Sequence, residues 1–246
     1  MLKLLKNIQE INKMYSKQII KDKLFSYSDK KYADFSSGLI PGAKPLIGVR
    51  IPVLRNLAKE IAKSDYINFL NTVDDEFFEE IMLKAFVIGY LNVDSDTLFS
   101  YIDDFIPQID NWSVNDSLCT TLKIVKKFPD KTWNFLKKYF NSDKEYENRF
   151  ANIMLMSHFL NDEYIDRVLM VYKDFNHSAY YAKMGVAWAV ATAYAKYPEK
   201  TMDLLKKWKV DAETYNMSIR KMCESYRVSD EDKAILKTMK KNKNNS

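Results

Sequence analysis

The chain has 246 residues, of which 47% are hydrophobic and 14% aromatic, and its formal net charge is +5. The hydrophobic content excludes an intrinsically disordered chain, and five glycines and six prolines are too few for the many tight turns of an all-β protein. The modest positive charge permits an anionic partner without requiring one.

The first predicted element is an amphipathic helix over residues 1–15, in which Leu2, Leu5, Ile8 and Ile11 alternate with polar side chains. A secretory signal would need an unbroken apolar core and a small-residue cleavage site. No run of about 18 apolar residues follows anywhere in the chain. We therefore expect a cytoplasmic protein without a membrane segment.

Residues 36–50 are predicted to form an ordered loop. The stretch FSSGLIPGAKPLIGVR contains Gly38, Pro41, Gly42 and Pro45. These residues interrupt helices, because glycine favours non-helical conformations and proline lacks the backbone N–H.

Four later segments share one pattern, amphipathic at the start and nearly all apolar further on. They are EFFEEIMLKAFVIGYL, DNWSVNDSLCTTLKIV, YENRFANIMLMSHFL and SAYYAKMGVAWAVATAY. Aligning them places Glu80, Asp116, Arg149 and Lys183 at equivalent positions, separated by 36, 33 and 34 residues. This spacing is typical of stacked helical hairpins, in which equivalent positions fall on one surface, usually the concave one.

An internal repeat supports the same architecture. KFPDKTWNFLKKY (127–139) and KYPEKTMDLLKKW (196–208) lie 69 residues apart and match or nearly match at nine of thirteen positions. In each copy a proline stands just inside the second of two helices, where its missing N–H costs little. We predict a single all-α domain over 1–246, a curved solenoid of about five to seven HEAT-like hairpins, with 237–246 as a frayed basic tail.

Charged residues in the first turns of helices also have structural explanations. A structural or solvated role accounts for Glu80 taken alone, because the helix dipole favours an acid there. An ion pair between neighbouring repeats is an open alternative for Asp116 and Arg149. Similarly, a tryptophan in a helical repeat usually packs in the core, which is the role expected for Trp133 and Trp208.

The cysteines and histidines predict no metal site. Two cysteines, Cys119 and Cys223, and two histidines, His158 and His177, show neither metal-ligand nor disulfide spacing. We expect reduced thiols and no metal or other cofactor.

The motifs LIGVRIPVLRNLAKEI, DNWSVNDSLC, YENRFANIML and YYAKMGVAWAVATAYAKYP resemble, in their order and spacing, the AlkD family of DNA alkylation repair proteins. That family consists of HEAT-like solenoids and includes DNA glycosylases. The resemblance covers nearly the whole chain. It implies that Trp112, Asp116 and Arg149 form the active site, and that Trp188 lies on the following repeat. Residues assigned to DNA binding are Trp188, Lys183 and Arg50.

The expected substrate is double-stranded DNA with cationic N3- or N7-alkylated purines, cleaved at the N-glycosidic bond by a monomeric protein. A carboxylate at Asp116 would stabilise the positive charge that develops on the sugar. The indole rings of Trp112 and Trp188 would attract a cationic base and stack on it. Arg149 would bind a backbone phosphate through paired hydrogen bonds.

The resemblance also implies a short extra helix near the N-terminus that grips DNA, at the place where 36–50 predicts a loop. Two functions therefore remain open. One is an alkylpurine DNA glycosylase. The other is a non-catalytic HEAT-like module that binds nucleic acid or protein through its concave face.

Overall fold

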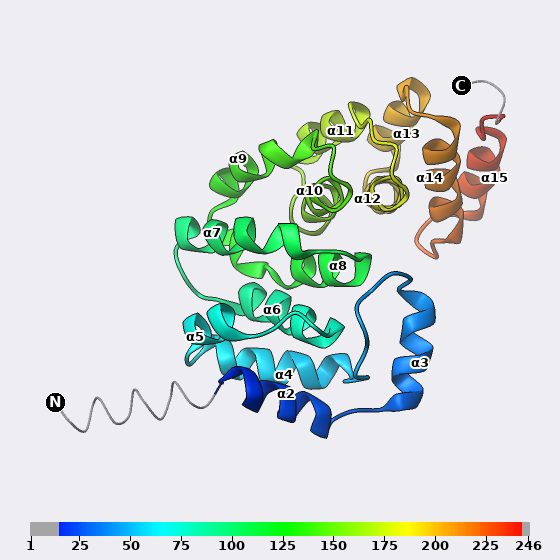
Figure 1. The fold of residues 1–246 in the computed structure, drawn as a ribbon. Coiled ribbons are helices and arrows are strands. Elements are labelled where there is room, and N and C mark those ends of the chain that lie inside the picture. The colour runs from blue at the N-terminus through cyan, green and yellow to red at the C-terminus, as the bar shows by residue number, and fades with distance from the viewer. Residues whose placement is uncertain (1–14, 243–246) are drawn as a thin grey trace, which may run out of the picture. The chain divides into compact units, whose positions relative to one another are not determined.

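The computed structural model describes residues 15–242, and all regular elements within this range are helical (Figure 1). The elements, with η for 3₁₀ helices, are α2 Lys17–Ser26, α3 Lys30–Leu39, α4 Ile51–Ala62, α5 Tyr66–Thr72, α6 Phe78–Tyr90, α7 Ser95–Phe105, η1 Ile106–Gln108, α8 Trp112–Thr121, η2 Lys123–Lys127, α9 Pro129–Phe140, α10 Glu145–His158, α11 Ile165–Lys173, α12 Tyr180–Lys196, α13 Pro198–Lys207, α14 Ala212–Glu224 and α15 Asp230–Thr238. The all-α prediction is confirmed for these residues.

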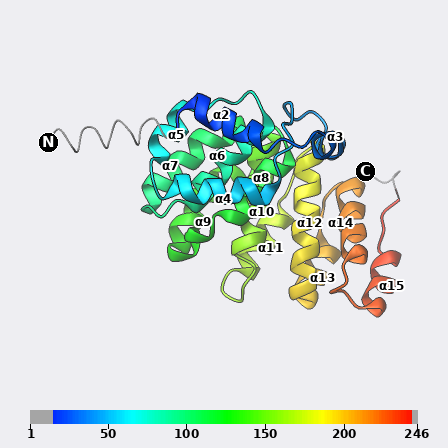
Figure 2. The same ribbon diagram turned by 90° about the horizontal axis from the view of Figure 1, so that it is seen from below.

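The described chain divides into two compact units, the first ending at Phe128 and the second beginning at Pro129. In the first unit, α6 packs against both α4 and α8. In the second unit, α12 packs against both α10 and α14 (Figures 1 and 2). Alternate helices thus lie side by side within each unit, as the sequence pattern predicts. A single curved solenoid over the whole chain stays a prediction.

The central helix of each unit is apolar because neighbours cover it. In α6 every residue from Phe78 to Gly89 is buried, which explains why its sequence reads as nearly continuous apolar residues. In α12 the buried positions include Ala182, Ala189 and Ala193. Alanine combines the highest helix propensity with a small side chain, so α10 and α14 can both pack closely against this helix.

The internal repeat corresponds to equivalent elements. Helices α9 and α13 begin at Pro129 and Pro198, as predicted from the two copies. Trp133 and Trp208 are 4% and 3% exposed, which confirms their predicted packing roles. The segment before Pro129 is the 3₁₀ helix η2 rather than an α-helix, so α8 ends earlier than its sequence pattern suggested.

The predicted loop over 36–50 is wrong at its start. Residues up to Leu39 belong to α3, whose N-terminus is capped by the Asp29 carboxylate accepting from the Tyr32 amide. No atom lies within 4 Å of the position that a Gly38 side chain would take. Gly38 therefore costs this helix only backbone entropy, and the helix ends before Pro41.

The rest of that stretch is an irregular segment anchored by Glu79, whose carboxylate accepts the amides of Ile47, Gly48 and Val49 at 2.8, 2.7 and 3.2 Å. Gly48 has φ +92°, and a side chain there would meet the Asp29 carbonyl oxygen at 2.1 Å. Only glycine fits both conditions. The segment thereby fixes α3 relative to α6 inside the first unit.

Two of the sequence predictions concern the ends of the chain. The predicted helix over 1–15 lies almost entirely outside the described residues. The predicted frayed tail is wrong over 237–241. Helix α15 extends to Thr238, and Asn216 exchanges two hydrogen bonds with the backbone of Lys241 at 2.8 and 2.9 Å. The Lys241 ammonium also donates to the carbonyls of Trp208 and Val210. Within residues 15–242, no helix has the length and hydrophobicity needed to cross a bilayer.

Candidate active site

Helix α8 carries the two residues that the sequence places at the centre of the site. The Asn111 side chain caps this helix by accepting from the Val114 amide at 3.0 Å. Because Trp112 opens the helix and Asp116 follows four residues later, both side chains lie on the same face. Both are half-buried, so each combines a supporting protein environment with access to solvent.

The indole of Trp112 is fixed by α3. Its Nε1 donates to the Leu39 main-chain carbonyl at 3.2 Å. Beside it lies a cavity of about 150 Å³, with Trp112, Leu39 and Ile40 among the residues in its wall. The helix missed by the sequence analysis therefore supplies the acceptor that orients this tryptophan.

The carboxylate of Asp116 is held by its neighbour. Asn115 is completely buried, and its Nδ2 donates to Asp116 Oδ1 at 3.0 Å. This amide donor restricts the rotation of the carboxylate. Asn115 is not among the site residues predicted from the sequence. The only available signal was an asparagine on the side of the helix that faces the core.

Glu80 has a structural role in this unit. It is 1% exposed, and its Oε2 accepts from the Phe77 amide at 2.9 Å, capping the start of α6. This contact agrees with the structural explanation for an acid in the first turn.

Arg50, assigned to DNA binding, is paired with an acid. Its Nη2 lies 2.8 Å from Asp29 Oδ2, and its guanidinium lies 4.8 Å from the centre of the Tyr32 ring. The pKa of the Asp29 carboxyl is lowered, first by the Tyr32 amide and then by Arg50. The arginine side chain is 62% exposed, so a phosphate could reach it in competition with Asp29.

In the second unit, Arg149 lies in the interior. It is 3% exposed, and its Nη1 donates to the Tyr181 carbonyl in the first turn of α12 at 2.8 Å. A side chain at Gly185 would lie 3.1 Å from Arg149 Cγ. Gly185 thus provides the space through which the arginine runs, a requirement that the sequence analysis did not anticipate.

Lys183 and Trp188 share α12 but differ in exposure. The Lys183 ammonium lies 2.8 Å from Glu213 Oε2 and 3.3 Å from Asp211 Oδ1. Its pKa is raised, chiefly by the hydrogen bond to Glu213, and this effect outweighs the partial burial of the ammonium. Trp188 is 38% exposed. The tryptophan is accessible to a ligand, whereas the lysine is neutralised by two carboxylates.

Among the described residues, no group of three or more His, Cys, Asp and Glu side chains is arranged to bind a metal ion.

The family model described as DNA alkylation repair enzyme matches residues 20–242. A search of curated proteins finds no match. The family match spans both compact units and includes all the site residues described above.

Proposed function

Because this chain belongs to the family of DNA alkylation repair enzymes, we propose that it is a DNA glycosylase releasing cationic N3- and N7-alkylated purines from double-stranded DNA. The observation that carries the proposal is the arrangement on α8. There Trp112 and Asp116 lie on one face, each held by a hydrogen bond at 3.2 or 3.0 Å.

Asp116 is the catalytic carboxylate of this proposal. An alkylated purine already carries positive charge, so it leaves readily as a neutral base. Cleavage of its glycosidic bond transfers positive charge to the deoxyribose. A fixed carboxylate stabilises this charge and positions the attacking water. The Asn115 amide supports the role because a carboxylate oriented in advance needs little rearrangement during the reaction.

Trp112 provides an aromatic surface for the damaged nucleotide. Indole faces attract cations and stack on bases. Each of these interactions contributes about 1–3 kcal/mol of binding free energy where water is displaced. The cavity of about 150 Å³ beside Trp112 is smaller than the roughly 300–1,000 Å³ of ordinary ligand pockets. This size supports handling of the nucleotide at the duplex surface over capture in a deep base pocket.

Within the second unit, Arg149 and Trp188 have proposed roles of their own. Burial of Arg149 and its bond to the Tyr181 carbonyl favour a positioning role at the start of α12 over direct grip of a phosphate. Trp188, exposed on the same helix, is the proposed DNA contact. Helix α3 ends at Leu39, so it occupies only the start of the stretch over 36–50 where the family resemblance implies a DNA-gripping helix.

The experiment is release of free base from methylated duplex DNA by the wild-type chain in excess over substrate, with the products separated by chromatography. We expect 7-methylguanine and 3-methyladenine in the soluble fraction. Duplex binding without any release contradicts the glycosylase and leaves a non-catalytic DNA-binding module. The pairing of Lys183 and Arg50 with acids instead favours a module that binds protein.

A further inference from the structure

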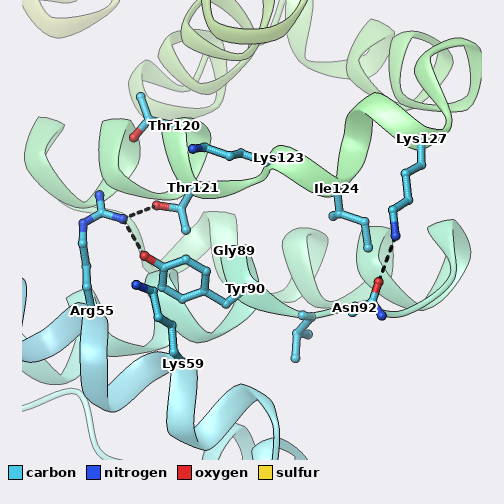
Figure 3. A pocket seen from close by; sticks show the side chains of 11 residues that line it. Arg55, Lys59, Gly89, Tyr90, Asn92, Thr120, Thr121, Lys123, Ile124 and Lys127 are labelled. Atoms are coloured by element: carbon cyan, nitrogen blue, oxygen red, sulfur yellow. Dashed lines mark hydrogen bonds between the residues drawn. The ribbon is translucent and has the colours of Figure 1, made fainter.

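The first unit contains a second candidate site, a cavity of about 730 Å³ between α4, the ends of α6 and α8, and η2 (Figure 3). We call it the basic pocket. The side chains that give it its character are Arg55, Lys59, Tyr90, Thr121, Lys123 and Lys127. No acidic residue lines the pocket, and neither Trp112 nor Asp116 does.

Arg55 is oriented in advance at the centre of this pocket. Its Nη1 donates to Tyr90 Oη and to Thr121 Oγ1, both at 3.0 Å (Figure 3). Its guanidinium also lies 4.1 Å from the centre of the buried Phe86 ring. Within the described part of the chain, Nε and Nη2 form no hydrogen bond. These two donors form one edge of the guanidinium, the edge that binds two oxygens of one anion side by side.

The two partners of Arg55 hold it without neutralising it. The Thr121 hydroxyl donates to the Ser117 carbonyl at 2.6 Å, so it accepts from Arg55. Since Tyr90 Oη also accepts from Arg55, its own proton is free to point into the cavity. Gly89 makes this contact possible, because a side chain there would meet Thr121 Cβ at 2.7 Å.

Three lysines line the pocket together with this arginine and have no carboxylate partner among the described residues. The Lys127 ammonium donates to Asn92 Oδ1 at 3.1 Å, and the Lys59 ammonium lies 5.4 Å from the centre of the Tyr90 ring. Lys123 makes no hydrogen bond within residues 15–242. Four cations that line one partly enclosed space without a counter-charge give it a positive potential.

Two other basic sites within residues 15–242 are neutralised locally. A cavity of about 250 Å³ between α11 and α13 includes three lysines, but Asp166 and Asp203 also line it, and Lys200 lies 2.7 Å from Asp166. Lys183 is likewise paired with two acids. The missing counter-charge therefore distinguishes the basic pocket from an ordinary basic surface.

We propose that the basic pocket binds a phosphate group, carried either by the DNA backbone or by a small phosphate ester. A tetrahedral phosphate presents several oxygens in different directions. This geometry suits the Arg55 edge, the Tyr90 hydroxyl and lysines arriving from α4 and η2. A volume of about 730 Å³ also leaves room for part of the molecule that carries the phosphate.

Titration calorimetry with inorganic pyrophosphate, at ionic strength held constant with sodium chloride, tests the pocket in the whole chain. The variants are Lys123→Ala, Arg55→Lys and the matched control Lys126→Ala, which removes one exposed cation of η2 that does not line the pocket. Lys123 is exposed and makes no hydrogen bond within residues 15–242, so its variant should fold. We expect about tenfold weaker binding for Lys123→Ala and Arg55→Lys, and less than a twofold change for Lys126→Ala.

A parallel arm uses undamaged duplex DNA, so its outcome is independent of base release. The phosphate belongs to the DNA backbone if the duplex displaces pyrophosphate. The same conclusion follows if Lys123→Ala lowers the affinity for the duplex but not the affinity for pyrophosphate. Removing one phosphate contact should reduce the slope of log affinity against log salt by about 0.9. If pyrophosphate binds selectively and the duplex does not compete, the ligand is a small phosphate ester. The proposal is overturned if neither probe binds, or if Lys123→Ala weakens neither more than Lys126→Ala does.

Discussion

The Nε1 of Trp112 donates to the main-chain carbonyl of Leu39 at 3.2 Å, joining the first residue of α8 to the last residue of α3. Trp112→Phe keeps the aromatic ring but removes the N–H, leaving this carbonyl without its donor. We expect a loss of about 1 kcal/mol in the free energy of unfolding and faster amide hydrogen exchange at the end of α3. Urea titration and exchange mass spectrometry measure these two quantities.

The matched control for this variant is Trp208→Phe, which removes the hydrogen bond from Nε1 of Trp208 to the Tyr172 carbonyl at 2.8 Å in the second unit. It should lower stability without changing exchange in α3. Unchanged exchange in α3 of Trp112→Phe would contradict the proposed link between tryptophan and helix.

Glu79 is predicted to be essential for the segment that precedes α4. Glu79→Gln keeps one oxygen, which can still accept from the amides of Gly48 and Val49, but replaces the other by an NH₂ group that cannot accept from the Ile47 amide. Because Glu79 is 1% exposed, water cannot take its place. We expect a loss of at least about 2 kcal/mol on chemical denaturation. Glu76→Gln changes an exposed carboxylate nearby and should have little effect, so equal losses would refute this role.

Two glycine-to-alanine changes should alter the free energy of unfolding in opposite directions. Gly38→Ala adds a methyl group to open space in α3 and should raise the free energy of unfolding by about 0.5–1 kcal/mol. Gly185→Ala should lower it. The new Cβ would lie 3.1 Å from Arg149 Cγ, and Arg149 cannot move aside without giving up its bond to the Tyr181 carbonyl. Stabilisation by both changes would show that Arg149 is not confined.

The contribution of Lys183 to the free energy of unfolding should decrease at alkaline pH. Because its pKa in the folded protein is raised above 10.5, the folded state holds the proton more tightly than the unfolded state. The ion pairs with Asp211 and Glu213 therefore stabilise fully below about pH 10.5 and lose their effect as pH rises through the raised pKa. We expect Lys183→Met to be about 1 kcal/mol less stable at neutral pH.

Denaturant titrations of both proteins from pH 7 to the alkaline limit of folding check this expectation. The difference in free energy of unfolding between wild type and Lys183→Met should shrink above pH 10.5. A difference that stays constant with pH would mean that Lys183 contributes through packing alone.

Much of the fold follows from local sequence. The starts of α9 and α13 were predicted from Pro129 and Pro198, because proline is favoured in the first turn and disrupts the interior of a helix. Helix α3 was missed because Gly38 suggested a break. The stabilising contact is the Asp29 cap, nine residues earlier in the chain, and a single glycine costs a helix only about 1 kcal/mol.

The site was predictable only where its residues share one helix. Trp112 and Asp116 lie four residues apart, so their common face follows from helical periodicity. Burial of Arg149 depends on the space at Gly185, and neutralisation of Lys183 depends on acids of α14 and its N-cap. The basic pocket joins residues of α4, α6, α8 and η2. Periodicity within a single helix carries no information about such contacts.

The most direct test of the central claim compares single-turnover release of 7-methylguanine by wild type and by Asp116→Asn. Asparagine keeps the size and shape of the side chain but removes the charge that would stabilise the sugar cation. We predict a loss of at least about a hundredfold in release, with melting temperature and duplex affinity nearly unchanged. Asp110→Asn, which removes a charge just before α8, should release base at the wild-type rate. Equal release by wild type and Asp116→Asn would contradict the account, as would a wild type that binds duplex but releases no base.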